Sequence, residues 1–179
     1  MAPPTIVLRS ARLALRPFTA DDAEPLAALH GDPDVMRFID TGRPVPRARV
    51  LTRPLPEFLA GRASGPRKWP PPARSSAGSR CGRPAPGRAE LGYRLRRAAW
   101  GRGYATEGAR AVLAYGFAEL GVRRVTATTM TVNRGSRRVL EKAGLRYVRT
   151  FFEEWPDHIE GAEHGDVNYA LSREEWAAS

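Results

Sequence analysis

Apolar residues recur along most of the chain at the spacings of short strands and helices. Thr5 to Arg16 alternates between apolar and polar positions, which predicts one or two short strands. The run Thr19-Ala-Asp-Asp22 is typical of a helix N-terminus, and Asp32-Pro33 suits the start of a second short helix that reaches Ile39. Arg47 to Ala60 favours a helix that two prolines interrupt.

The second half of the chain has a clearer pattern. Ala89 to Leu95 alternates like a strand, and apolar residues from Ala105 to Leu120 recur every three or four positions, as in a helix that Gly121 ends. The remaining elements are a strand over 122–132, whose change of phase between Ala127 and Met130 suggests a β-bulge, a helix over 135–143, and strands over 145–152 and 166–171. Strands that alternate with helices predict an α/β or α+β sheet protein, here as one domain over residues 1–179.

Gly61 to Arg88 has none of this patterning. Its 28 residues include six Arg, one Lys, six Pro, five Gly and no acid, and Trp69 is its one large apolar side chain. Such a segment buries too little apolar surface to offset the conformational entropy lost on ordering, and its prolines exclude a long helix. We expect this segment to be disordered.

Most of the net charge lies in that segment. The chain has 29 Lys and Arg against 19 Asp and Glu, a net charge of +10, which alone suggests a nucleic-acid or membrane partner. Gly61 to Arg88 carries +7 of this charge, which leaves +3 on the other 151 residues. The segment lacks the interleaved aromatics of a nucleic-acid-binding arm, so we expect a solvated linker and no nucleic-acid partner.

Cysteine content and hydropathy bear on where the protein resides. A single Cys forms no internal disulfide and no multi-cysteine zinc site, so a reducing compartment is expected. No apolar run approaches the roughly 18 residues of a membrane span, and Met1-Ala-Pro-Pro lacks the basic and apolar blocks of a signal peptide. These features predict a cytoplasmic protein with no membrane partner.

The turn before the predicted helix of Ala105 carries the strongest chemical signal. Gly101-Arg-Gly103-Tyr-Ala-Thr106 places glycines just before a helix, where first-turn N–H groups and the helix dipole favour a phosphate, although such glycines also serve simply to turn the chain. A P-loop needs Gly-Lys-Ser/Thr, and a dinucleotide-binding loop needs a third glycine and an acid about twenty residues further on. The chain has neither pattern.

Several motifs occur in a fixed order within two blocks, about 6–39 and 89–176. They are Ser10-Ala-Arg-Leu-Ala-Leu-Arg-Pro-Phe18, Asp21-Asp-Ala23, Asp32-Pro-Asp-Val-Met36, Glu90-Leu-Gly-Tyr-Arg-Leu95, Trp100-Gly-Arg-Gly-Tyr-Ala-Thr-Glu107 and Asn133-Arg-Gly-Ser-Arg-Arg-Val-Leu-Glu-Lys-Ala-Gly144. Together they resemble the GNAT superfamily of acetyl-CoA-dependent N-acetyltransferases, and within it the ribosomal-protein-alanine (RimJ/RimL-like) branch.

The resemblance implies a fold and an activity. The fold is a mixed, mostly antiparallel central sheet with helices on both faces, in which the strand from Gly92 to Arg96 splays from the strand at Val125 and opens a wedge for pantetheine. The activity is direct transfer of an acetyl group from acetyl-CoA to a primary amine, of a protein N-terminus or a small molecule, in a ternary complex. A non-catalytic acyl-CoA-binding relative is the alternative. A monomer or a homodimer is expected.

The resemblance also assigns the acetyl-CoA site. The family's Gln/Arg-x-x-Gly-x-Gly/Ala loop is matched from Trp100 to Ala105, so that backbone N–H groups there hold the pyrophosphate, while Arg102 adds charge or stays solvated. Backbone groups near Leu95 and Arg97 bind pantetheine, and the side chain of Asn133 binds either pantetheine or the gap between the two strands. The expected cofactor-binding residues are Leu95, Arg97, Trp100, Gly101, Arg102, Gly103, Tyr104, Ala105, Thr106 and Asn133.

Aminolysis of a thioester needs a neutral amine and a proton for the leaving thiolate. Many family members supply that proton from a Tyr at the position of Leu140, which has no proton to give, whereas the RimJ/RimL-like branch uses a Ser, matched here by Ser136. Helix capping is the alternative role of Ser136 and Asn133. For the base, the resemblance favours Glu154, beside Glu153, with Glu90 as second choice. The expected catalytic residues are Ser136 and Glu154.

No metal is expected at this site. His158 and His164 lie in a polar loop and are expected to be solvated, and Cys81 lies within Gly61 to Arg88 with no catalytic partner.

The family normally places its second and third strands where Gly61 to Arg88 lies, so these two strands are expected to be missing or disordered. The composition of the segment is what off-frame translation of GC-rich DNA gives, and we hypothesise a compensated frameshift or a sequence error there. Resequencing that finds one uninterrupted frame through codons 61 to 88 would contradict this hypothesis.

Overall fold

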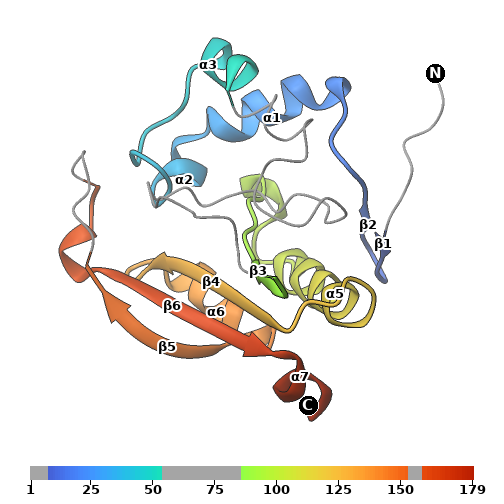
Figure 1. Ribbon diagram of the computed structural model, residues 1–179. Helices are drawn as coiled ribbons and strands as arrows, with labels where there is room; N and C mark the ends of the chain where they lie inside the picture. The colour runs from blue at the N-terminus through green and yellow to red at the C-terminus, as the bar shows by residue number, and fades with distance from the viewer. Residues whose placement is uncertain (1–7, 54–85, 153–158) are drawn as a thin grey trace.

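A mixed four-stranded sheet organises the protein. The computed structural model describes residues 8–53, 86–152 and 159–179. The sheet has the order β3-β4-β6-β5 (Figure 1) and consists of β3 (Arg88–Glu90), β4 (Arg124–Met130), β5 (Arg146–Phe151) and β6 (Asp166–Ser172). The β3–β4 pair is parallel and the other two pairs are antiparallel, which confirms the expected mixed, mostly antiparallel sheet.

Alternating residues of β4 and β6 build the main core. Val125 lies opposite Leu171 and Ala127 opposite Tyr169, and all four are buried. Two helices, α5 (Tyr104–Ala118) and α6 (Arg134–Lys142), pack onto these residues, and α7 (Arg173–Ala177) adds Trp176 at the edge. No helix among the described residues is long and apolar enough to cross a bilayer.

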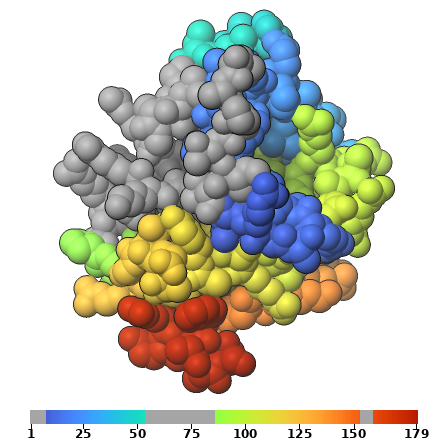
Figure 2. All heavy atoms as spheres, turned by 90° about the vertical axis from the view of Figure 1, so that its right-hand side faces the viewer, coloured from blue at the N-terminus to red at the C-terminus, as the bar shows by residue number. Residues whose placement is uncertain are grey.

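The N-terminal elements form a hairpin and a second helical group. β1 (Leu8–Arg9) pairs with β2 (Ala14–Leu15), which confirms the two short strands, and Figure 2 shows this hairpin in dark blue against α5. The helices are η1 (Ala20–Asp22), α1 (Ala23–His30), α2 (Pro33–Met36) and α3 (Arg47–Thr52), at the top of Figure 1. They have a small core of their own around Leu26, Ala27 and Val50.

The prediction of a β-bulge in β4 is wrong. β4 pairs with β6 without a break from Arg124 to Met130. The change of phase arises because Thr129 and Met130 point to opposite faces and are both buried, 8% and 2% exposed, so this end of the sheet is covered on both sides. The register shift of the sheet falls instead between Tyr147 and Arg149 of β5.

The chain leaves the sheet soon after β3. The strand expected from Ala89 to Leu95 ends at Glu90, and Leu91 N–H still donates to Thr126 O at 2.8 Å. β4 continues to Met130, whereas the segment that follows Leu91 rises toward α1, forms the turn η2 (Arg97–Ala99) and returns to α5 (Figure 1). β4 and the segment that follows Leu91 therefore separate at the position where the family resemblance predicts a splayed pair of strands.

Most of the segment expected to be disordered, 61–85, lies outside the described residues. At its end, Arg88 begins β3, so the ordered sheet starts one residue earlier than the pattern predicts.

Candidate functional site

The loop before α5 has the conformation that its glycines predict. Gly101 and Gly103 adopt φ values of 73° and 79°, in the left-handed region that favours glycine, and Gly103 is the N-cap residue of α5. A Cβ atom on Gly101 would have no atom within 4 Å, so open space borders the backbone there. Tyr104, Ala105 and Thr106 form the first helical turn, whose N–H groups have no partner within the helix. This end of α5 is suited to an anion.

A basic pocket adjoins this helix end. Its volume is about 730 Å³, and it is lined by the β1–β2 turn on one side and by Gly103, Thr106 and neighbouring residues of α5 on the other. The charged residues of the lining are Arg9, Arg12, Arg110, Lys142 and Glu107. With four cations and one carboxylate, the pocket attracts anions.

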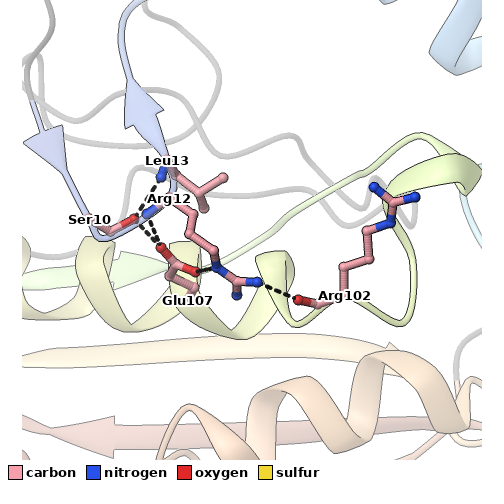
Figure 3. Close-up of polar contacts among 5 residues, drawn as sticks. All are labelled: Ser10, Arg12, Leu13, Arg102 and Glu107. Carbon is pink, nitrogen blue, oxygen red and sulfur yellow. Dashed lines mark hydrogen bonds and ion pairs between the residues drawn. The ribbon is translucent and has the colours of Figure 1, made fainter.

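Glu107 ties the β1–β2 turn to α5. Its Oε1 accepts hydrogen bonds of 2.7 Å from the Ser10 hydroxyl and from the backbone N–H of Arg12 (Figure 3). The Ser10 hydroxyl first, and then the N–H of Arg12, lower the pKa of Glu107 below its usual value. The carboxylate therefore stays ionised at neutral pH and holds the turn against the helix.

Trp100 closes the segment that leads into the loop. Its Nε1 donates to Leu95 O at 2.9 Å and its backbone N–H donates to Arg97 O at 3.0 Å. The Arg97 side chain forms an ion pair with Asp34 of α2. The backbone carbonyls of Leu95 and Arg97, the two residues expected to bind pantetheine, thus each accept a hydrogen bond from Trp100.

Asn133 and Ser136 lie at the start of α6, and they meet Tyr93. Asn133 is the N-cap, and its Oδ1 accepts a hydrogen bond of 3.1 Å from Ser136 N–H. The Tyr93 hydroxyl donates to Ser136 O at 2.9 Å and lies 3.1 Å from Ser136 Oγ. Burial raises the pKa of Tyr93 to about 12, so its hydroxyl remains protonated at neutral pH. Tyr93 belongs to the segment that parts from β4 and thus joins that segment to α6.

A half-buried cation, Arg94, fixes the other side of the same segment. Arg94 Nη1 lies 2.8 Å from Nε2 and 3.1 Å from Nδ1 of His30, which is 5% exposed. Burial, and then the charge of Arg94, lower the pKa of His30 to about 4, so the ring is neutral and accepts the hydrogen bond. Burial also lowers the pKa of Arg94 to about 10, while Asp40 opposes that shift. Residues 93 and 94 therefore anchor the segment to α6 and to α1.

Residues 12–146 match the family described as Acetyltransferase (GNAT) domain. The chain belongs to the GNAT acetyltransferase family. It is 35% identical over 185 residues to the FsC-acetyl coenzyme A-N(2)-transacetylase of Aspergillus fumigatus, with 94% of this chain and 77% of that protein covered.

Solved structures of other GNAT proteins share the fold. RimJ of Mycobacterium smegmatis, in complex with CoA-disulfide, matches with a TM-score of 0.68 at 19% identity and covers 90% of this chain and 82% of its own. Spermidine N-acetyltransferase from Vibrio cholerae, in complex with CoA and spermine, matches with a TM-score of 0.69 at 14% identity and covers 94% and 99%. At these identities the likeness confirms the GNAT fold.

The remaining residues named from the sequence fall into three groups. Leu140 is a core residue, 1% exposed, and Glu90 lies in β3. His164 is exposed and lies 3.6 Å from Glu163. Glu153, Glu154, His158 and Cys81 lie outside the described residues. No group of three potential metal ligands occurs within the described ranges.

Sequence reasoning gave no role to Tyr93, Arg12 or Glu107, although all three fall within the quoted GNAT motifs. Tyr93 reaches Ser136 across 43 residues, and Arg12 reaches Glu107 across 95. The sequence shows only that these three residues belong to the motifs, and motif membership does not tell which residues contact one another.

Proposed function

We propose that this GNAT protein transfers the acetyl group of acetyl-CoA to a primary amine held in the same complex. The observation that carries the proposal is the loop from Gly101 to Gly103, which opens the N-terminal end of α5 onto the basic pocket. Backbone N–H groups from Gly101 to Thr106 suit the pyrophosphate of acetyl-CoA, and the open space beside Gly101 lets a phosphate approach the backbone. The pantetheine arm then extends between β4 and the segment that parts from it.

Ser136 is the proposed proton donor. The amine nitrogen attacks the thioester carbonyl, so that a C–N bond forms and the C–S bond breaks. The departing thiolate takes the proton of the Ser136 hydroxyl, and the proton lost by the amine restores that hydroxyl through the base. Tyr93 supports the role of Ser136, because the Tyr93 hydroxyl contacts both the carbonyl oxygen and the hydroxyl oxygen of Ser136.

A carboxylate is the proposed base. Glu154 is the first candidate and Glu90 of β3 the second. Their Gln variants distinguish them, because loss of the true base removes the acidic limb of the pH profile of kcat/KM, whereas loss of the other carboxylate leaves that limb in place.

The acceptor is the least constrained part of the proposal. The relative from Aspergillus fumigatus is named for an N(2) nitrogen, and a protein that shares the fold is named for spermidine. The RimJ/RimL-like motifs of this chain resemble those of enzymes that act on a protein N-terminus, but the sequence does not discriminate between a protein N-terminus and a small-molecule amine. Both kinds of amine therefore belong in the acceptor panel.

The direct test is an acetyl-transfer assay on the full chain. Acetyl-CoA is mixed with spermidine, an aminoglycoside and a peptide with N-terminal alanine, thiol release is followed, and the acetylated product is identified by mass. Transfer to one of these amines is expected, with kcat lowered about 100-fold in Ser136→Ala and largely retained in Ser136→Thr. Stabilisation by acetyl-CoA without transfer to any amine would support the non-catalytic alternative. Unchanged kcat in Ser136→Ala would remove Ser136 from the mechanism.

A further inference from the structure

Arg12, at the turn between β1 and β2, is held in one orientation by Glu107. Its Nε lies 2.7 Å from Glu107 Oε2, while its backbone N–H binds the other carboxylate oxygen (Figure 3). The Glu107 side chain is only 16% exposed. Because the carboxylate binds both the backbone and the side chain of Arg12, the guanidinium has a fixed position beside α5.

The rest of the guanidinium contacts the loop. Its Nη1 donates to Arg102 O at 3.0 Å, and its central carbon lies 4.7 Å from the centroid of the Tyr104 ring. Its Nη2 would lie 3.4 Å from a Cβ atom on Gly103. One side chain thus contacts the loop on both sides of Gly103. The side chain of Arg102 itself extends away from this cluster (Figure 3).

This contact determines where an N–H group of the loop points. The carbonyl of Arg102 and the N–H of Gly103 belong to one peptide unit, which is trans, so the two groups point in opposite directions. With the carbonyl turned toward Arg12, the Gly103 N–H is turned away from it. A hydrogen bond from a cation also polarises the peptide and makes its N–H a stronger donor.

We propose that Arg12 is a positioning residue for the phosphates of acetyl-CoA. It orients the peptide between Arg102 and Gly103 so that the Gly103 N–H faces the pyrophosphate and the carbonyl does not. The inference rests on the proposed function, because that function supplies the pyrophosphate. It adds a residue of the N-terminal hairpin to a cofactor loop that is 90 residues away in the sequence.

The test compares two ligands that differ at the phosphates. CoA and pantetheine share the thiol arm, and pantetheine lacks the pyrophosphate and nucleotide. The Kd of each ligand is measured by calorimetry for the wild type, Arg12→Met, Arg12→Gln and Arg12→Lys. Arg9→Met removes the same charge from the pocket, so the effect of the contact with the loop is the amount by which the loss in Arg12→Met exceeds the loss in Arg9→Met. Thermal melting identifies any variant that does not fold, and Arg12→Gln, which keeps an N–H donor, is the milder change.

Arg12→Met is expected to raise the Kd for CoA about tenfold and to leave the Kd for pantetheine within about twofold. Arg12→Lys should resemble Arg12→Met, because one ammonium group does not reach both Glu107 and Arg102 O in the geometry of a guanidinium. Equal losses for both ligands, no loss for CoA, or wild-type affinity in Arg12→Lys would overturn the inference. Because the readout is binding, it is independent of acetyl transfer: a wild-type protein that binds CoA and acetylates no amine contradicts the proposed function alone.

Discussion

The Tyr93 hydroxyl donates a hydrogen bond of 2.9 Å to the carbonyl oxygen of Ser136 and lies 3.1 Å from its hydroxyl oxygen. Two contacts from one phenol restrict both the backbone and the side chain of Ser136. The same phenol belongs to the segment that separates from β4 after Leu91. The proposed proton donor is thus positioned by the chain that forms one wall of the proposed pantetheine site.

Tyr93→Phe should therefore lower kcat more than it raises the KM for acetyl-CoA. The ring and its packing remain, and only the hydroxyl that orients Ser136 is lost, so we expect a fall of about tenfold in kcat. Steady-state kinetics with both substrates varied give the two constants. Tyr147→Phe is the control, because the Tyr147 hydroxyl lies 2.9 Å from the Thr150 hydroxyl on the exposed strand β5. A fall of equal size in both variants would argue against the role of Tyr93.

Asn133 has two proposed roles that substitutions separate. Asn133→Ala removes the cap of α6 and should lower the free energy of unfolding by about 1 kcal/mol. Asn133→Asp keeps an oxygen that accepts from Ser136 N–H, so its stability in urea should match the wild type. It lacks the side-chain amide N–H that an asparagine can donate to pantetheine, so its Kd for acetyl-CoA should rise several-fold. A wild-type Kd in Asn133→Asp would leave Asn133 with the capping role alone.

Gly101→Ala should weaken acetyl-CoA binding beyond its effect on stability. The left-handed backbone at φ 73° makes alanine unfavourable by about 1 kcal/mol, and the new Cβ would occupy the space proposed for a phosphate. Gly121→Ala is the matched control, since Gly121 has φ 67° and also has no atom within 4 Å of a Cβ position, but lies beyond the other end of α5. We expect similar losses of stability in urea and a Kd raised tenfold or more in Gly101→Ala only. Equal affinities in the two variants would exclude a phosphate at Gly101.

His30 should make the protein less stable in mild acid. Its pKa is lowered to about 4 in the folded protein because the ring is buried, whereas the unfolded chain has the ordinary value of 6.5. Below pH 6.5 the unfolded state binds a proton that the folded state excludes, so the free energy of unfolding falls by up to about 1.4 kcal/mol per pH unit toward pH 4. Urea unfolding at pH 7, 6 and 5 measures this slope.

His30→Gln keeps an acceptor for Arg94 and does not titrate, so its slope between pH 7 and 5 should be flatter. The window above pH 5 avoids the carboxylates Asp22 and Glu107, whose lowered pKa values place their losses of stability in stronger acid. Equal slopes in the variant and the wild type would show that His30 is not the titrating group.

The features that follow from local patterns were predictable from the sequence. The helical spacing from Ala105 to Leu120 and the alternation of Val167, Tyr169 and Leu171 predicted α5 and β6, because burial on one face repeats with the geometry of each element. The glycines at 101 and 103 predicted a turn into a helix. The strand from Ala89 to Leu95 was predicted too long, since alternation reports which side of an extended chain is covered and not whether it pairs with a neighbour.

The contacts that complete the site were not predictable in the same way. Tyr93 with Ser136, Arg94 with His30, and Arg12 with Glu107 each join residues at least 43 positions apart. Such pairs form only after the sheet and helices have packed, and no local period encodes them. The prediction of a bulge in β4 was wrong for a related reason. Both faces of the sheet near Met130 are buried, and the segments that bury them are distant in the sequence.

The hydrogen bond between Arg12 and the loop has a consequence for the rate at which acetyl-CoA associates. The loop backbone at Arg102 is held by a hydrogen bond of 3.0 Å from Arg12, a contact within the protein itself. A loop whose shape is set beforehand needs no slow rearrangement when acetyl-CoA arrives, so the association rate should depend on diffusion and on the charge of the pocket. It should then fall steeply as salt screens the pocket, and dissociation should respond much less.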